Sequence, residues 1–120
     1  RVLVGTTVDL ADQVQAGTFS KELFALFSNL TLHTPPLRVR VADIRVLARH
    51  FAFRFAREMG KRFLGFSRDA ELRLAQHEWP GNVRELRNLV ERVVSATDSS
   101  EIGLDELSSW LPAKSDLPRA

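Results

Sequence analysis

The clearest candidate for chemistry is an arginine at the start of a predicted helix, in the run Trp79-Pro80-Gly81-Asn82-Val83-Arg84-Glu85-Leu86. Pro80-Gly81 is a turn signal, and Asn82 is predicted to cap the helix with Glu85 in the capping-box position. Arg84 then lies in the first turn, where the helix dipole disfavours a cation. An arginine there fits an anion, and its planar fork suits phosphate. Pairing of Arg84 with a nearby acid, Glu85 or Glu78, is the alternative that spacing leaves open.

Metal chemistry has little support in the sequence. The histidines, His33, His50 and His77, are scattered, and none has a histidine or carboxylate partner at metal-ligand spacing. There is no cysteine, so disulfides and thiolate sites are excluded and a reducing cytoplasm is compatible. We therefore predict ordinary surface or packing histidines and no metal site.

Composition bounds the class of protein. The chain has 120 residues, 44% hydrophobic and 27% charged, which is ordinary for a globular domain. It has no apolar run near the length of about 18 residues that a membrane span needs. A net charge of +2 is too small to indicate nucleic acid by itself. Because the first residue is Arg1 and not Met, we expect the sequence to begin inside a longer protein.

The first part of the chain resembles the end of an α/β layer. Val2–Val4 is predicted to be a buried strand and Leu30–Thr34 a short strand that ends at two prolines. Between them, a helix over 9–16 is closed by Gly17, and Ser20 caps another helix.

The second part of the chain shows helical periodicity. Predicted helices run from Ala42 to Met59, from Ser67 as a cap, from Asn82 as a cap, and from Asp105 to Leu111. The predicted fold is therefore mainly α. It comprises a core remnant at 1–34, a helical bundle at 35–112 and a linker or tail at 113–120.

The run from Trp79 to Asn88 resembles the sensor II motif of the sigma-54-dependent (NtrC-like) AAA+ transcription activators of bacteria. Further segments resemble that family in the right order. They are the sensor I segment at 5–10, the start of the arginine-finger helix at 17–23, the start of the lid at 35–44 and the closing lid helix at 102–111. The resemblance covers nearly the whole chain. It implies the end of an AAA+ α/β core followed by a helical lid.

The resemblance also implies residue roles. Arg84 is the sensor II arginine that touches nucleotide phosphates from the lid. Thr6 and Thr7 are the sensor I polar residues facing the γ-phosphate and the attacking water, with Thr7 standing where the family usually has asparagine. Arg38 faces the nucleotide or a neighbouring subunit. Arg40 does the same or pairs with Asp43.

The departure from the family lies in the finger helix. Its pattern there is Phe-Arg-x-Asp-Leu-x-x-Arg-Leu, but this chain has Ser20 and Leu26 at the arginine positions. An arginine finger is worth about 10³ to 10⁵ in rate, or roughly 4 to 7 kcal/mol of transition-state stabilisation. Lys21 offers a point charge and not a planar fork. We expect poor ATP hydrolysis or none.

Other parts of the machinery are expected outside this chain. No Gly-x-x-x-x-Gly-Lys-Ser/Thr loop is present, so the chain is not an ATPase by itself and should bind no cofactor tightly. The resemblance implies ATP with magnesium in the full-length protein. It also implies sigma-54 RNA polymerase and DNA as partners through other parts, a ring-type homo-oligomer and a cytoplasmic location without a membrane.

One structural consequence follows from the resemblance. In an AAA+ core, the strand that leads into the phosphate loop separates the strand before sensor I from the strand corresponding to Leu30–Thr34. Without that central strand the two cannot pair as in the parent fold. Residues 1–34 are therefore expected to be reorganised, disordered or paired with another chain.

Three functions remain open. The first is an ATP-binding module of a sigma-54-interacting regulator. The second is a degenerate, non-hydrolysing regulator or scaffold, favoured by Ser20 and Leu26 and excluded if the full-length protein hydrolyses ATP briskly. The third is a small helical DNA-binding domain, suggested by Arg84, Arg87 and Arg92 on one helix, which predicts salt-sensitive binding to duplex DNA.

Overall fold

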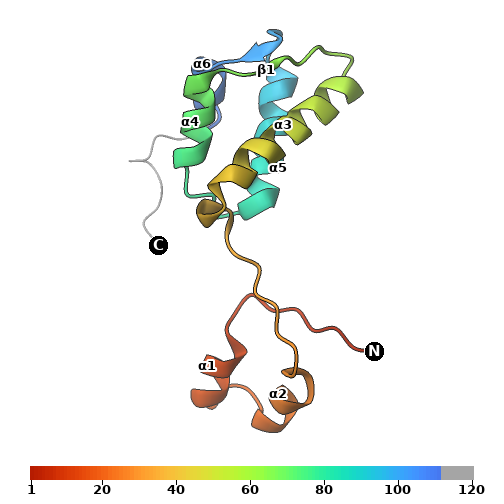
Figure 1. Cartoon of the computed structure of the whole chain (residues 1–120), viewed down its shortest axis with the longest axis vertical. Coiled ribbons are helices and arrows are strands. Elements are labelled where there is room, and N and C mark those ends of the chain that lie inside the picture. Colours follow the sequence, from red (N-terminus) through yellow and green to blue (C-terminus); the bar gives the residue numbers. More distant parts are fainter. Residues whose placement is uncertain (112–120) are drawn as a thin grey trace. The chain divides into compact units, whose positions relative to one another are not determined.

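The computed structural model describes residues 1–111, which form two compact units (Figure 1). One unit comprises residues 1–34, and the other begins at Pro35. Helices provide most of the regular secondary structure in both, so the prediction of a mainly α chain is confirmed.

Two short, locally capped helices make up the N-terminal unit. Helix α1 (Leu10–Gln15) begins at Asp9, whose carboxylate accepts a backbone N–H of the first turn at 2.9 Å. It closes before Gly17, which has φ +76° and so needs the freedom of glycine. Helix α2 (Lys21–Phe27) begins at Ser20, whose hydroxyl accepts a first-turn N–H at 3.2 Å. Both predicted starting points are confirmed.

The two strands predicted for this unit are absent. Val2 is 82% exposed and Leu3 91% exposed, and neither Val2–Val4 nor Leu30–Thr34 forms a ladder. Within residues 1–111 the sole sheet lies in the other unit. A strand needs a neighbour for its N–H and C=O groups, and neither segment has one within residues 1–111. The strand prediction was therefore wrong, whereas the expectation that the two segments do not pair is confirmed.

From Pro35 to Leu111 the second unit contains four α-helices, a 3₁₀ turn and a small sheet. Its elements in chain order are η1 (Leu37–Val39), α3 (Val41–Glu58), β1 (Gly65–Phe66), α4 (Arg68–Gln76), α5 (Asn82–Ala96), β2 (Glu101–Ile102) and α6 (Leu104–Ser108). Helix α6 is shorter than the predicted Asp105–Leu111. The predicted tail at 113–120 lies outside the described residues.

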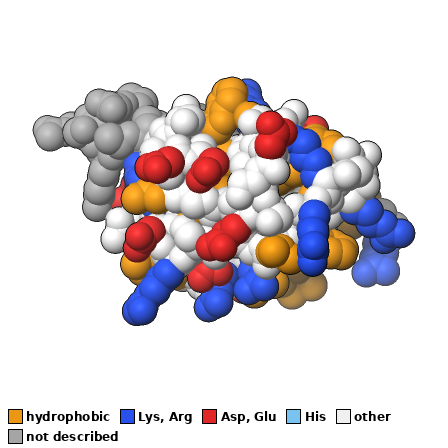
Figure 2. All heavy atoms as spheres, turned by 90° about the horizontal axis from the view of Figure 1, so that it is seen from above, with side chains coloured by type: hydrophobic (Ala, Val, Ile, Leu, Met, Phe, Trp, Pro, Cys, Tyr) orange, Lys and Arg blue, Asp and Glu red, His pale blue; other side chains and the backbone are white. Residues whose placement is uncertain are grey.

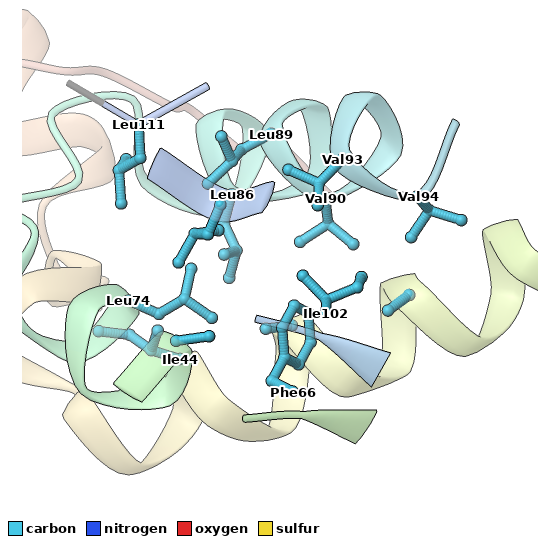
Figure 3. Close-up of a cluster of buried hydrophobic side chains, with 14 of the residues drawn as sticks. Ile44, Phe66, Leu74, Leu86, Leu89, Val90, Val93, Val94, Ile102 and Leu111 are labelled. Atoms are coloured by element: carbon cyan, nitrogen blue, oxygen red, sulfur yellow. The ribbon is translucent and has the colours of Figure 1, made fainter. Parts of the chain in front are cut away.

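Helices α3 and α5 pack together along their apolar faces and form the core of this unit. Figure 3 shows Leu86 of α5 on the side of Ile44 of α3 and Leu74 of α4, and Val90 of α5 on the side of Ile102 of β2. Each fully buried side chain of this size contributes about 1.5–3 kcal/mol. The largest side chains under 2% exposed are Trp79, Leu37, Ile44, Leu74, Leu86, Ile102, Leu107, Val90 and Val93. The buried stripe of α5 consists of Leu86, Leu89, Val90, Val93 and Val94, and Val83 beside it is only partly buried.

A two-stranded parallel sheet fixes the far end of the unit, and sequence reasoning missed it. Gly65 pairs with Glu101 and Phe66 with Ile102. Two residues per strand give no alternation that periodicity can detect. The sheet anchors the start of α4 and the start of α6 at the same place, and Ser67 then caps α4 as predicted.

Lys61 holds the C-terminal end of α5 from across the unit. Its Nζ donates to the carbonyls of Val94, Ser95 and Thr97 at 2.9, 2.8 and 3.0 Å. These carbonyls belong to the last turn, where an α-helix leaves its acceptors without intrahelical partners. A cation there also complements the helix dipole. Lys61 therefore ties the loop after α3 to the end of α5.

Replacing Lys61 with methionine removes these bonds while keeping an apolar stem. We expect Lys61→Met to lower the free energy of unfolding by about 1–2 kcal/mol, because the carbonyls lose charge-assisted donors in a partly buried place. Denaturant unfolding measures the change. Arg62→Met is the matched control, since Arg62 is exposed and makes no ion pair within residues 1–111. Equal unfolding midpoints for the two variants would contradict this role.

Candidate nucleotide-sensing site

The corner between α4 and α5 is built on the indole of Trp79. The side chain is 0% exposed, and its Nε1 donates to the carbonyl of Leu74 at 2.8 Å. That carbonyl lies in the last turn of α4, so the indole satisfies an acceptor that the helix leaves open. The ring of His77 packs edge-on against Trp79 with centroids 4.6 Å apart. Trp79 has φ +50°, an uncommon backbone conformation that this packing stabilises.

Glu85 closes the corner with both carboxylate oxygens. Oε1 lies 2.8 Å from Nε2 of buried His77, and Oε2 accepts the backbone N–H of Gly81 at 2.7 Å. Because a carboxylate only accepts, Nε2 carries the proton of this bond. A Cβ on residue 81 would lie 2.7 Å from Cβ of Glu85, so glycine is required there for space. The histidine prediction is confirmed for His77 as a packing residue, and His33 and His50 are exposed.

Asn82 does not cap the helix, which corrects the sequence prediction. It has φ +51°, and its side-chain Oδ1 accepts the backbone N–H of Leu37 at 2.9 Å. The N-cap position is Gly81, and Glu85 reaches back to that residue from four positions along. Glu85 accepts the backbone N–H of Gly81 at the helix start, so the side chain of Asn82 is not needed as a cap. Its Oδ1 instead ties η1 to the start of α5.

Arg84 projects from the first turn of α5 into a pocket of about 380 Å³. The pocket is lined by Gly81, Arg84, Glu85, Asn88, Leu89, Arg92, Trp110 and Leu111. Arg84 is exposed and makes no hydrogen bond or ion pair within the described part of the chain. The alternative of pairing with Glu85 or Glu78 is therefore not adopted. The Arg84 guanidinium keeps all its donors for a group that enters the pocket.

Arg38 is distant from this corner in sequence, but its neighbour Leu37 is bonded to the corner through Asn82. It follows Leu37, whose N–H is held by Asn82, and its side chain is exposed. A guanidinium nitrogen of Arg40 instead lies 3.7 Å from a carboxylate oxygen of Asp43. Of the two roles predicted for Arg40, the structure therefore has the ion pair with Asp43. The arrangement brings the backbone of Arg38 to the start of α5.

The other predicted site residues belong to the N-terminal unit. The Thr6 hydroxyl accepts the N–H of Val8 at 3.2 Å, and Thr7 is exposed. Ser20 is occupied as the cap of α2. Leu26 is 78% exposed on that helix.

Sequence reasoning missed most of the pocket lining. Asn88 and Arg92 follow Arg84 at i+4 and i+8, which puts them on one side of α5, and this spacing was the available signal. Trp110 comes from the segment after α6, and nothing in the sequence links it to Arg84. Residues 1–111 contain no group of side chains arranged to hold a metal ion. No helix in that range is long and apolar enough to cross a bilayer.

Comparisons with known proteins agree with this architecture. Residues 38–118 match the AAA+ ATPase lid domain family. The alginate biosynthesis transcriptional regulatory protein AlgB of Pseudomonas syringae pv. tomato is 36% identical over 99% of this chain, which spans 27% of that relative. The transcriptional regulatory protein XylR of Pseudomonas putida is 42% identical over 84% of the chain and 18% of its own length. The psp operon transcriptional activator of Escherichia coli is 38% identical over 89% of the chain and 33% of its own length.

A solved structure shows the same fold. The crystal structure of NtrX from Brucella abortus in complex with ATP superposes with a TM-score of 0.74 at 32% identity, covering 96% of this chain and 26% of that one. The chain therefore belongs to the AAA+ ATPase lid domain family. Its relatives confirm the resemblance to the sigma-54-dependent activators that the run from Trp79 to Asn88 had indicated.

The Asn82 contact gives a graded test of how the site is held. We expect Asn82→Asp to be nearly neutral, because aspartate keeps the acceptor and tolerates positive φ. Asn82→Gly should cost about 1 kcal/mol by leaving the Leu37 N–H without its acceptor. Asn82→Ala should cost more, since it loses the bond and also strains the backbone. Thermal unfolding of the three variants measures the order, and an alanine variant as stable as the aspartate variant would contradict it.

Proposed function

We propose that this chain is the nucleotide-sensing lid of an ATP-dependent bacterial transcription regulator, with Arg84 contacting the phosphates. One observation carries the proposal. Arg84 stands at the mouth of a pocket without any acid partner, although Glu85 is its immediate neighbour. A guanidinium left unpaired beside a helix start suits a phosphoryl oxygen.

The relatives support the wider role. Those named above are transcriptional regulators, and NtrX was crystallised with ATP and with ADP. The chain spans about a quarter of the AlgB proteins it matches, so the rest of the machinery belongs to other parts of the full-length protein. For that protein we propose ATP with magnesium, sigma-54 RNA polymerase and DNA as partners, a ring-type homo-oligomer and a cytoplasmic location. Residues 1–111 contain no group of side chains arranged for a metal ion, so we propose magnesium ligands outside that range.

Three further residues are proposed to face the nucleotide in the full-length protein. Thr6 and Thr7 are exposed and carry hydroxyls suited to a phosphate oxygen or a water. Arg38 is exposed and has no ion pair within residues 1–111. Its backbone neighbour Leu37 is held against the start of α5, which supports a place near Arg84.

A second candidate function is a regulator that binds ATP without hydrolysing it efficiently. The two finger positions support this candidate. Ser20 is committed to capping α2, and Leu26 is an exposed alkyl side chain that offers no charge. Nucleotide binding would then act as a conformational signal, with little turnover.

A DNA-binding role has less support. Arg87 lies 5.3 Å over the ring of Phe55 and 3.7 Å from Glu91, so it is engaged within the lid. Figure 2 views the end of the lid that carries β1, where Asp and Glu side chains are mixed with Lys and Arg and no purely basic face is seen. The segment 97–111 contains acids and no Lys or Arg, which disfavours a phosphate backbone there.

The sensing role of Arg84 is tested in the full-length protein. We expect Arg84→Ala to weaken ATP binding about tenfold or more, because a charge-assisted bond to phosphate is lost. Arg57→Ala is the matched control, since Arg57 is an exposed arginine of α3 without an ion pair in the described region. Calorimetric titration with ATP measures both variants. Equal affinities for the two would reject the role of Arg84.

The finger positions give a separate gain-of-function test. Leu26→Arg should fold normally because residue 26 is 78% exposed, and it should raise ATP turnover by at least about tenfold over a slow parent. Ser20→Arg should also cost about 1 kcal/mol in stability through the lost cap. Steady-state phosphate release measures turnover. Fast hydrolysis by the unchanged protein would exclude the non-hydrolysing candidate.

A further inference from the structure

The pocket beside α5 has a second cation that the sensor role of Arg84 does not use. Arg84, Asn88 and Arg92 follow one another at intervals of four residues, and all line the same pocket. Residues at this spacing share one side of a helix. Two arginines therefore converge on the pocket with an amide side chain between them.

Within residues 1–111 no acid neutralises the two arginines of this pocket. Neither Arg84 nor Arg92 has an ion pair within residues 1–111. Glu85 also lines the pocket, but its two oxygens are bound to His77 and Gly81. Arg87 offers a contrast, since it is held by Phe55 and Glu91. The free cations of α5 are thus those that face the pocket.

The remaining lining restricts water on one side. Trp110 and Leu111 come from the segment after α6, and Leu89 comes from α5. Leu111 is 4% exposed, whereas Trp110 is 45% exposed and presents its ring at the surface. An apolar wall beside two guanidinium groups lowers the local dielectric and strengthens their attraction for an anion.

The distance between the cations indicates the shape of the anion. Eight helical residues rise about 12 Å along the axis. Long side chains can close part of that gap, and Asn88 offers a donor midway. An elongated anion with more than one phosphoryl group makes better use of both arginines than a single phosphate does.

We propose that this pocket binds the polyphosphate chain of a nucleotide, with Arg92 as a second phosphate-binding residue. Arg84 holds one phosphoryl group and Arg92 another. That the polyphosphate belongs to ATP rests on the function proposed above. The two-arginine pocket itself predicts a measurable preference for diphosphate over monophosphate.

The test uses the 120-residue chain with two probes, inorganic pyrophosphate and inorganic phosphate. In NMR titrations the side-chain Nε resonances of the arginines report weak binding residue by residue. Tryptophan fluorescence gives a second signal, and a change on binding is assigned to Trp110 because Trp79 is 0% exposed and shielded from the ligand. We expect pyrophosphate to shift both Arg84 and Arg92. Arg92→Ala should weaken pyrophosphate about fivefold while changing phosphate less than about twofold, as fits a partly exposed charge contact. Arg84→Ala should weaken both probes, and Arg57→Ala neither.

The outcomes separate this inference from the proposed function. If Arg84→Ala weakens binding and Arg92→Ala titrates like the parent, the second site is rejected and the sensor role of Arg84 stands. If pyrophosphate shifts neither arginine, the pocket is no phosphate site and the inference fails. The effect of Arg84→Ala on ATP binding by the full-length protein then decides the proposed function separately. If both anions are weakened equally by Arg57→Ala, the binding reflects net charge alone and the pocket is rejected.

Discussion

The buried hydrogen bond from the Trp79 indole to the carbonyl of Leu74 is the contact on which the lid depends. It ends α4, turns the chain and sets the place where α5 begins. The indole is fully enclosed, so removing its partner would leave a buried donor unsatisfied. The positive φ values of Trp79 and Asn82 follow from this corner, because the chain must reverse within a few residues.

The corner also explains why an arginine can stay unpaired next to a glutamate. The two carboxylate oxygens of Glu85 are bonded to His77 and Gly81. These bonds stabilise the start of α5 and leave Glu85 without an ion pair to Arg84. Asn82 then ties η1 to the same place through Leu37. The polar side chains of Glu85 and Asn82 are therefore engaged in structural hydrogen bonds, and the guanidinium of Arg84 remains available for a ligand.

The N-terminal unit is organised by different forces. Helices α1 and α2 bury none of their residues and are held by local caps and by edge-on contacts of Phe27 with Phe19 and Phe24. Isolated helices of this length are marginal, because nucleation is costly and few residues share its cost. The lid, in contrast, buries an apolar core between α3 and α5. The lid thus has a core that positions a site, and the N-terminal unit has only local contacts.

The sequence by itself determined the helices, most of their caps and the family, because these depend on residues close together in the chain. Helical periodicity, the Ser67 cap and the run ending in Leu86 are local patterns. Only the tertiary structure decided which polar group bonds to which. Asn82 was predicted to cap its own helix but bonds across 45 positions to Leu37, and Trp110, which follows α6 in the chain, lines the pocket beside α5. Such contacts form only when packing brings distant segments together, so the spacing of residues along the chain does not predict them.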